Sequence, residues 1–262
     1  MTVSFAVTAY EETVKFGPSG ILKILECITP AIFHPGIDEV VVVDDHSTDA
    51  VELFEVLTGM NKVKVHGNSE NLGVFGNKVE SIASCTSDWV ICCDSDNRMD
   101  HKFIDKAISN MWSEKYWHCP SFAKPKFDYR PFIGQYNSAN IAELVQAPGL
   151  SGCLLNTGNQ TVNRKAFMEV FGKYRGCRAD LMMPNWLGLP EEERRKIHNR
   201  IVFDACDSLI LNMEWIKSGG VMNVAEGMEY EHYWTGGDES HYNRAPKEKH
   251  QLNEILLKEL SQ

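Results

Sequence analysis

The sequence has no basic segment and no long apolar run, and both absences restrict its partners. Its 262 residues carry 26 Lys and Arg against 36 Asp and Glu, which gives a net charge of −10. A chain with this balance is a poor partner for nucleic acid. No apolar run approaches the roughly 20 residues that span a bilayer, and the apolar residues 3–7 lack the preceding basic region of a signal peptide. We therefore expect a cytoplasmic protein with no membrane span.

Closely spaced cysteine pairs are also missing. None of the eight cysteines forms a C-x-x-C pair, and the adjacent Cys92 and Cys93 point to opposite faces of a predicted strand. This pattern disfavours a zinc site or a disulfide framework. We expect small, buried thiols in a reducing compartment.

The loop after the first apolar segment lacks the patterns of three other enzyme classes. It contains no G-x-G-x-x-G, which a nicotinamide-dependent dehydrogenase needs at this place. It reads Ala-Tyr-Glu-Glu from Ala9, whereas a sugar-1-phosphate nucleotidyltransferase would carry a Gly-rich loop with Arg and Lys. The first aspartate of the chain is Asp38, so a phosphatase nucleophile after the first strand is excluded.

Short apolar segments alternate with helical patterns through the first 105 residues. Strands are predicted at residues 4–8, 39–43, 63–65 and 89–93, and helices at 19–32, up to 57, up to 85 and from 101. Ser47 or Thr48 is the expected N-cap of the second helix. This order predicts an α/β fold with a mostly parallel central sheet flanked by helices. Ligands of such sheets bind beyond the carboxyl ends of the strands.

Polar clusters follow three of these strands. Asp94 and Asp96 come directly after residues 89–93, and two carboxylates so close together favour a hard divalent cation. The alternative is a strand-ending turn in which Asp96 or Asn97 caps the helix from His101. The other two clusters are Thr8 with Tyr10, and Asp44 with Asp45. Since all three lie at the same edge of the predicted sheet, we expect one site.

Three motifs in this region resemble the inverting family 2 glycosyltransferases of the GT-A fold. They are V-V-V-V-D-D-H-S-T-D at residues 40–49, Asn71-x-Gly73 with Asn77, and the segment 89–96 that ends in D-S-D. The resemblance implies a single GT-A domain over residues 1–262. Residues 1–105 would form the nucleotide-sugar half, residues 106–245 an elaborated acceptor-side half, and residues 246–262 a C-terminal helix.

The resemblance also implies roles for individual residues. Thr8 would contact the nucleotide, Tyr10 would lie against the base, and Asp45 would accept a hydrogen bond from the base. Asp94 and Asp96 would hold Mn²⁺ or Mg²⁺, with Asp96 the more direct ligand. The residues expected to bind the donor are Thr8, Tyr10, Glu12, Asp44, Asp45, Asn71, Gly73, Asn77, Asp94 and Ser95. For Asn71, Gly73 and Asn77 we favour a supporting role in the loop and helix start.

The catalytic base is expected near the start of an apolar-periodic helix after residue 204. The family places an acidic pair here, about a dozen residues before a glycine. Asp207 precedes Gly219 by that interval, and Cys206 stands where the family usually has Glu. Asp204 is the second candidate. The alternative is that either aspartate only complements the helix dipole.

His232 is the predicted third metal ligand, because many GT-A enzymes place a histidine in this region. The alternative is a histidine that only packs against its aromatic neighbours. For the aromatic side chains between residues 116 and 146, core packing is favoured over stacking on an acceptor sugar. Residues 247–260 read as an amphipathic helix that packs on the body of the protein.

These expectations combine into one function, a metal-dependent inverting glycosyltransferase of the hexosyltransferase type. It would move a sugar from a nucleoside-diphosphate sugar, by default a UDP-sugar, to a hydroxyl of a glycan or glycoconjugate. The alternative is a non-catalytic nucleotide-sugar-binding or scaffold protein with a GT-A-like fold. Two carboxylates in D-x-D and a candidate base argue against that alternative.

Overall fold

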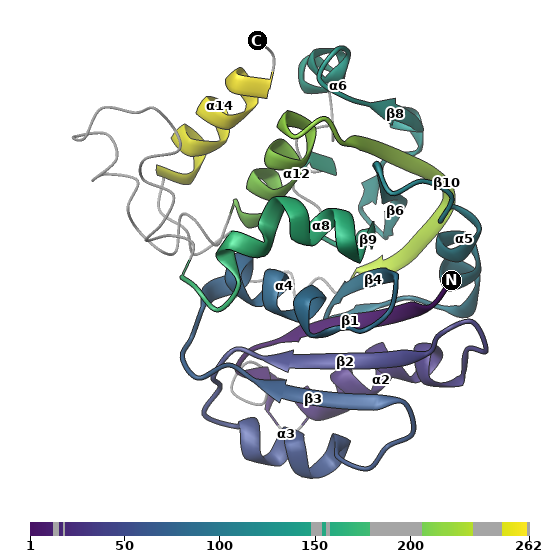
Figure 1. The fold of residues 1–262 in the computed structure, drawn as a ribbon, viewed down its shortest axis with the longest axis vertical. Coiled ribbons are helices and arrows are strands. Elements are labelled where there is room, and N and C mark those ends of the chain that lie inside the picture. Colours follow the sequence, from purple (N-terminus) through teal and green to yellow (C-terminus); the bar gives the residue numbers. More distant parts are fainter. Residues whose placement is uncertain are drawn as a thin grey trace.

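A ten-stranded mixed sheet runs through the centre of the computed structural model (Figure 1). The structure describes residues 1–12, 16–17, 19–147, 154–155, 158–178, 206–232 and 248–260. The main strand order is β3-β2-β1-β4-β9-β6-β10-β5, and β7 and β8 pair with β6 and β10.

The first four strands form a parallel block, as the sequence predicts. They are β1 (Val3–Ala9), β2 (Glu39–Asp44), β3 (Val63–Gly67) and β4 (Trp89–Asp94). Every residue of β2 is buried, because this strand lies inside the sheet and is covered on both faces. The helices between these strands are α2 (Ser19–Phe33), α3 (Ala50–Leu57) and α4 (Gly73–Ser84).

The predicted N-cap of α3 is wrong, and so is the alternative in which Asp96 or Asn97 caps α5. Helix α3 begins at Ala50 after Asp49, and Ser47 donates to Asp44 three residues before it, so Ser47 closes a turn and caps no helix. Thr48 also lies outside the cap position. Helix α5 (His101–Ser109) is capped by Asp100, whose carboxylate accepts from the backbone N–H of Phe103. Asp96 and Asn97 are therefore not caps of this helix.

The second half of the sheet starts with a short antiparallel strand that the sequence did not indicate. Strand β9 (Thr161–Asn163) pairs antiparallel with β4 on one side and with β6 on the other. The strands beyond it are β6 (Tyr116–Lys124), β10 (Val221–His232) and β5 (Asn97–Arg98). The small strands β7 (Phe127–Asp128) and β8 (Gly134–Tyr136) complete the sheet.

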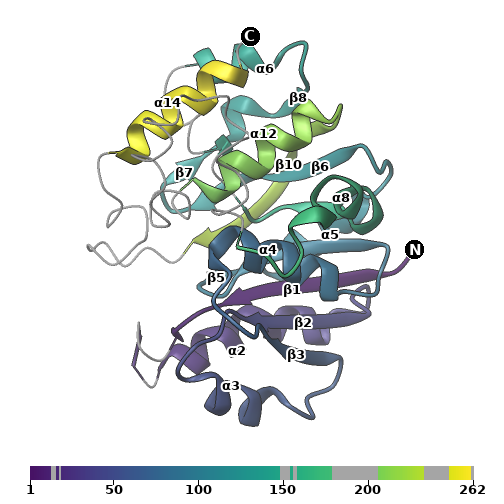
Figure 2. The same ribbon diagram turned by 60° about the vertical axis from the view of Figure 1, so that its left-hand side comes forward.

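Helices cover both faces of the sheet. On one face α4 packs with α8 (Arg164–Phe171) and α12 (Asp207–Lys217), whereas α2 and α5 contact each other on the other face (Figures 1 and 2). The remaining helices are α6 (Ile141–Gln146), α14 (Glu248–Leu260) and the 3₁₀ turns η1 (Arg130–Phe132) and η2 (Gly172–Tyr174). Helix α14 packs against α12 and α6, as predicted. No helix in the described parts of the chain is long and apolar enough to cross a membrane.

The buried core confirms two further predictions. Trp117 is buried and stacks on Trp215, with a centroid distance of 4.8 Å, and it also contacts Phe167 and Phe171. Core packing is therefore confirmed for this tryptophan. Among the described cysteines, five are buried and form no disulfide, also as predicted: Cys27, Cys85, Cys93, Cys119 and Cys206.

Candidate active site

The polar clusters after β1, β2 and β4 meet at one edge of the sheet. Because the three strands are parallel neighbours, their carboxyl ends coincide. The backbone N–H of Ser95 donates to the carbonyl of Thr8 (3.2 Å), and the N–H of Asp45 donates to the carbonyl of Ala9 (2.9 Å). The structure thus brings the three predicted clusters together.

Asp94 lies in the middle of this edge, at the last position of β4. Its Oδ1 atom is 3.4 Å from the Thr8 hydroxyl and 3.4 Å from the ammonium of Lys78. About a third of its side chain, 34%, stays exposed. Asp94 is therefore held on one oxygen by the protein and open towards solvent.

The loop after β1 is fixed to β4 through Glu12. This carboxylate is buried and accepts from the hydroxyl of Ser95 at 2.6 Å and from the backbone N–H of Tyr10 at 3.4 Å. Tyr10 itself is half-buried. Glu12 and Ser95 thus contact each other, and a direct contact of either with a donor stays a prediction.

Asp44 shapes the turn after β2. Its two oxygens accept from the backbone N–H of Ser47 (2.9 Å) and from its hydroxyl (2.5 Å). Burial raises the pKa of Asp44, against the effect of these hydrogen bonds. Ser47 also accepts the backbone N–H of Glu11, which joins this turn to the loop after β1.

Asp45 binds the amino terminus of α4. Its oxygens accept the backbone N–H groups of Leu72 and Gly73, both at 2.8 Å, and the side-chain amide of Asn68 at 2.9 Å. This carboxylate satisfies free N–H groups at a helix start. Its predicted hydrogen bond to a base stays a prediction, and its contacts within the chain are structural.

Asn77 and Asn71 have supporting positions. Asn77 is buried and donates to the carbonyls of Ala9 and Val43, which ties α4 to β1 and β2. The side chain of Asn71 accepts the N–H of Gly73 at 3.0 Å. Gly73 has φ of +81°, a backbone conformation that favours glycine.

His232 is the last residue of β10 and so belongs to the strand, whereas the sequence predicted that it follows the last core strand. Its Nδ1 atom is 2.9 Å from the side-chain oxygen of Asn97. Because an amide oxygen only accepts, Nδ1 carries the proton and Nε2 keeps its lone pair. Burial lowers the pKa of His232, against the charge of Asp94, and so favours the neutral ring. A neutral imidazole with a free Nε2 is the form that binds metals.

The donor atoms near this edge fit a hard divalent cation in chemical type. Asp94 and Asp96 offer carboxylate oxygens and His232 an imidazole nitrogen, a set that suits Mn²⁺ and also admits Mg²⁺. Among the described residues, no three His, Cys, Asp or Glu side chains are already gathered around one point. The role of these three side chains as metal ligands therefore stays a prediction.

Asp207, at the start of α12, lies at the same edge and contacts Lys78, which no sequence motif marks. The ammonium of Lys78, on α4, is 2.8 Å from Oδ2 of Asp207 and 3.1 Å from the hydroxyl of Ser208. Burial by itself lowers the pKa of Lys78, but the charges of Asp207 and Asp94 raise it above the ordinary value. The available signal was that Lys78 is the single charged residue of the segment 71–79. Asp204, the second candidate base, lies outside the described residues.

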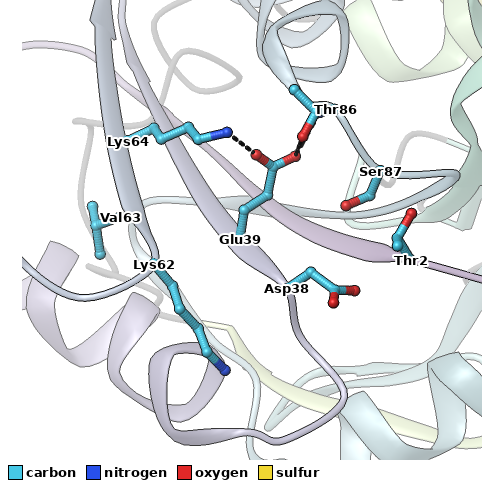
Figure 3. A pocket seen from close by; sticks show the side chains of 8 residues that line it. All are labelled: Thr2, Asp38, Glu39, Lys62, Val63, Lys64, Thr86 and Ser87. Carbon is cyan, nitrogen blue, oxygen red and sulfur yellow. Dashed lines mark hydrogen bonds and ion pairs between the residues drawn. The ribbon is translucent and has the colours of Figure 1, made fainter.

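A separate hollow lies at the opposite edge of the sheet (Figure 3). It has a volume of about 440 Å³, and Glu39 points into it from the first position of β2. Lys64 and Thr86 both bind this carboxylate. The hollow contains none of the predicted site residues.

Comparison with known proteins identifies the family to which the chain belongs. The model of the family described as Glycosyl transferase family 2 matches residues 4–175. No curated protein sequence matches the chain significantly.

Solved structures share the fold at low sequence identity. Residues 1–349 of TarS from S. aureus match with a TM-score of 0.53 and 16% identity, over 88% of this chain and 59% of that one. The same TarS fragment in complex with UDP-GlcNAc gives 0.58 and 15%, over 98% and 66%. The mannosyltransferase PcManGT from Pyrobaculum calidifontis, in complex with GDP-Man and Mn²⁺, gives 0.53 and 14%, over 90% and 58%. The predicted α/β fold, with a mixed and mostly parallel sheet of the GT-A type, is confirmed.

Proposed function

Because the chain belongs to glycosyl transferase family 2, we propose that it transfers a sugar from a nucleoside-diphosphate sugar to a hydroxyl of a glycan or glycoconjugate. The proposal includes a hexosyl group, a UDP-sugar donor, inversion at the anomeric carbon and a cytoplasmic location. The TarS and PcManGT structures contain UDP-GlcNAc and GDP-Man, respectively, which supports a nucleotide sugar as donor and leaves the base to experiment.

One observation carries the proposal: two carboxylates from distant parts of the chain share a single ammonium at the ligand-binding edge of the sheet. Lys78 contacts Asp94 of β4 and Asp207 of α12. Sugar transfer needs stabilisation of a leaving diphosphate and a base for the incoming hydroxyl. The two carboxylates occupy positions suited to these two tasks.

On the donor side, Thr8, Tyr10 and Asp45 are proposed to line the nucleotide. Asp94, Asp96 and His232 would hold Mn²⁺ or Mg²⁺. When bound, this ion supplies positive charge that stabilises the departing diphosphate.

On the acceptor side, Asp207 is the proposed base. Its Oδ2 is occupied by Lys78 and Ser208, and Oδ1 has no hydrogen-bond partner among the described residues. Oδ1 would take the proton of the acceptor hydroxyl as that oxygen attacks the anomeric carbon. The bond from that carbon to the diphosphate breaks, and its electron pair leaves with the nucleoside diphosphate.

The test is titration calorimetry of UDP, GDP and dTDP with and without Mn²⁺, on the wild type and on Asp96→Ala. We expect one nucleotide to bind in the presence of Mn²⁺, and we expect Asp96→Ala to weaken that binding about 10- to 100-fold, as for the loss of a group at a metal site. Asp105→Ala is the control, because this aspartate is 71% exposed and pairs with His34.

The rival is a protein that binds a nucleotide sugar without turning it over. Release of free sugar from the donor in the absence of an acceptor separates the two, since a binding protein has no such activity to lose. If no nucleotide binds the wild type under any condition, the transferase proposal fails. If nucleotide binds but neither hydrolysis nor transfer follows, the binding function replaces it.

A further inference from the structure

Lys78 is a charged residue in a place where charges are rarely found. It lies on α4 and only 7% of it is exposed. Burial of an ammonium is unfavourable unless its charge and its three N–H groups find partners. The contacts of the Lys78 ammonium therefore indicate its role.

The partners of Lys78 come from two other elements of the protein, α12 and β4. The ammonium lies 2.8 Å from Asp207, 3.1 Å from the hydroxyl of Ser208 and 3.4 Å from Asp94. Ser208 in turn donates to the same Oδ2 atom of Asp207, at 3.0 Å. Two donors thus hold Oδ2 of Asp207, and within the described parts of the chain Oδ1 has no hydrogen-bond partner.

The backbone near residue 158 is shaped around this lysine. A Cβ atom on Gly158 would lie 2.1 Å from the Lys78 nitrogen and 2.7 Å from the Ser208 hydroxyl. Only glycine leaves enough room for the ammonium at its observed position. The position of Lys78 therefore depends on the segment before β9 as well as on α4.

From these contacts we infer that Lys78 is a positioning residue for the transfer, which holds Asp207 by one oxygen and keeps it beside Asp94 of the donor site. The inference rests on the proposed function and goes beyond it, because it assigns the link between the two sides of the site. This positioning role differs from that of a residue that only binds the donor phosphates.

The charge balance explains why a cation at this point helps the reaction. Before transfer, the single positive charge of Lys78 faces the carboxylates of both Asp207 and Asp94 and balances one of their two negative charges. As the acceptor proton moves to Oδ1 of Asp207, the negative charge there disappears, and the electron pair of the breaking bond appears on the diphosphate. The same ammonium then faces negative charge on the donor side only. It thus remains compensated at both stages and needs no large displacement.

The experiment is donor hydrolysis with water as acceptor, measured for the wild type, Lys78→Met, Asp207→Asn and the double variant. Loss of a general base lowers kcat by about 10²–10⁴-fold, which we expect for Asp207→Asn. Lys78→Met is expected to lower kcat at least about 10-fold and to change the donor KM less than about 3-fold, the signature of a group that acts in the transition state. The double variant should be within about 3-fold of Asp207→Asn, because residues that act through each other are not additive.

Lys64→Met is the matched control. It removes an ion pair with Glu39 at the opposite edge of the sheet, where Lys64 is 49% exposed, and kcat should stay unchanged. Lys78→Met leaves two carboxylates without their cation and can unfold the protein. In that case the comparison of the double variant with Asp207→Asn still tests the inference, because the double variant also lacks the negative charge of Asp207.

Three results overturn the inference. The first is a double variant whose losses multiply, and the second is a Lys78→Met protein with wild-type kcat. The third is a raised donor KM with unchanged kcat, which identifies a phosphate ligand alone. In all three the wild type is active, so the proposed function stands. A wild type that hydrolyses no UDP-, GDP- or dTDP-sugar and binds none of the three nucleotides overturns the proposed function and the inference with it.

Discussion

At the scale of single residues, Gly158 is the most restrictive position of the candidate site. Its missing side chain makes room for the ends of Lys78 and Ser208. Because the end of a lysine is flexible, a methyl group here would push the ammonium away from Asp207 without breaking the fold. The contact of Lys78 with Asp207 thus depends on a residue that carries no functional group.

We therefore predict that Gly158→Ala lowers the rate of donor hydrolysis about 10-fold or more, a loss comparable to that of one charge-assisted hydrogen bond. Its thermal midpoint should change little. Gly172→Ala is the control, since its added Cβ would meet only Met168, at an ordinary 3.5 Å. If Gly158→Ala hydrolyses the donor at the wild-type rate, the space beside Gly158 does not set the contact of Lys78 with Asp207.

At the scale of elements, Glu39 joins three segments at the amino-terminal edge of the sheet (Figure 3). Its carboxylate accepts from Lys64 of β3 at 2.6 Å, from Ser4 of β1 at 2.5 Å and from Thr86 before β4 at 2.9 Å. Burial alone raises the pKa of Glu39, but these hydrogen bonds lower it to about 2. Folding therefore stabilises the ionised form of Glu39.

A pH dependence of stability follows. The ordinary pKa of this glutamate is 4.5 and the folded value is about 2, so its contribution is complete above 4.5 and disappears as the pH falls to 2. Glu39→Gln should lower the free energy of unfolding at pH 7 by about 1–3 kcal/mol, the range for hydrogen bonds to charged groups. Urea unfolding between pH 7 and 3 tests this. A difference between the two proteins that stays constant over this range would contradict the assignment.

Strand β9 is the other decisive element, because it joins the two halves of the sheet. Its central residue, Val162, is 1% exposed and lies between β4 and β6. Val162→Ala should destabilise the protein by about 2 kcal/mol, as for the removal of buried methyl groups. Val51→Ala, at a residue that is 67% exposed, serves as control. We expect one cooperative transition for the wild type in differential scanning calorimetry. Two separate transitions in the wild type would show that β9 does not couple the halves.

At the scale of the whole molecule, the sequence predicted the parallel half of the fold well. Residues 40–43 and 89–93 are apolar throughout and are followed by acidic residues, so both the burial of these strands and their polar ends could be read directly. The C-terminal half was harder, because β9 has only three residues and its pairing with β4 and β6 depends on contacts far along the chain. No local pattern marks such a strand.

The candidate site was predictable to a similar degree. Asp94, Asp45 and Asp207 stand out because they follow apolar strands or begin a helix, and the structure brings all three to one face. Lys78 could not be assigned from sequence, since its importance arises from its distance to Asp207. Asp207 and Lys78 are separated by 129 positions. Electrostatic pairs between such distant positions become visible only in the folded chain.

That separation also sets an order in time. During synthesis the ribosome releases β1 to β4, with Asp94 and Lys78, long before it reaches Asp207. A nascent chain of this protein therefore carries most of the residues proposed for the donor, from Thr8 to Asp96, before it carries the proposed base, and His232 follows later. On this account the growing polypeptide cannot consume nucleotide sugar prematurely, and its activity begins only when α12 has emerged and docked on α4.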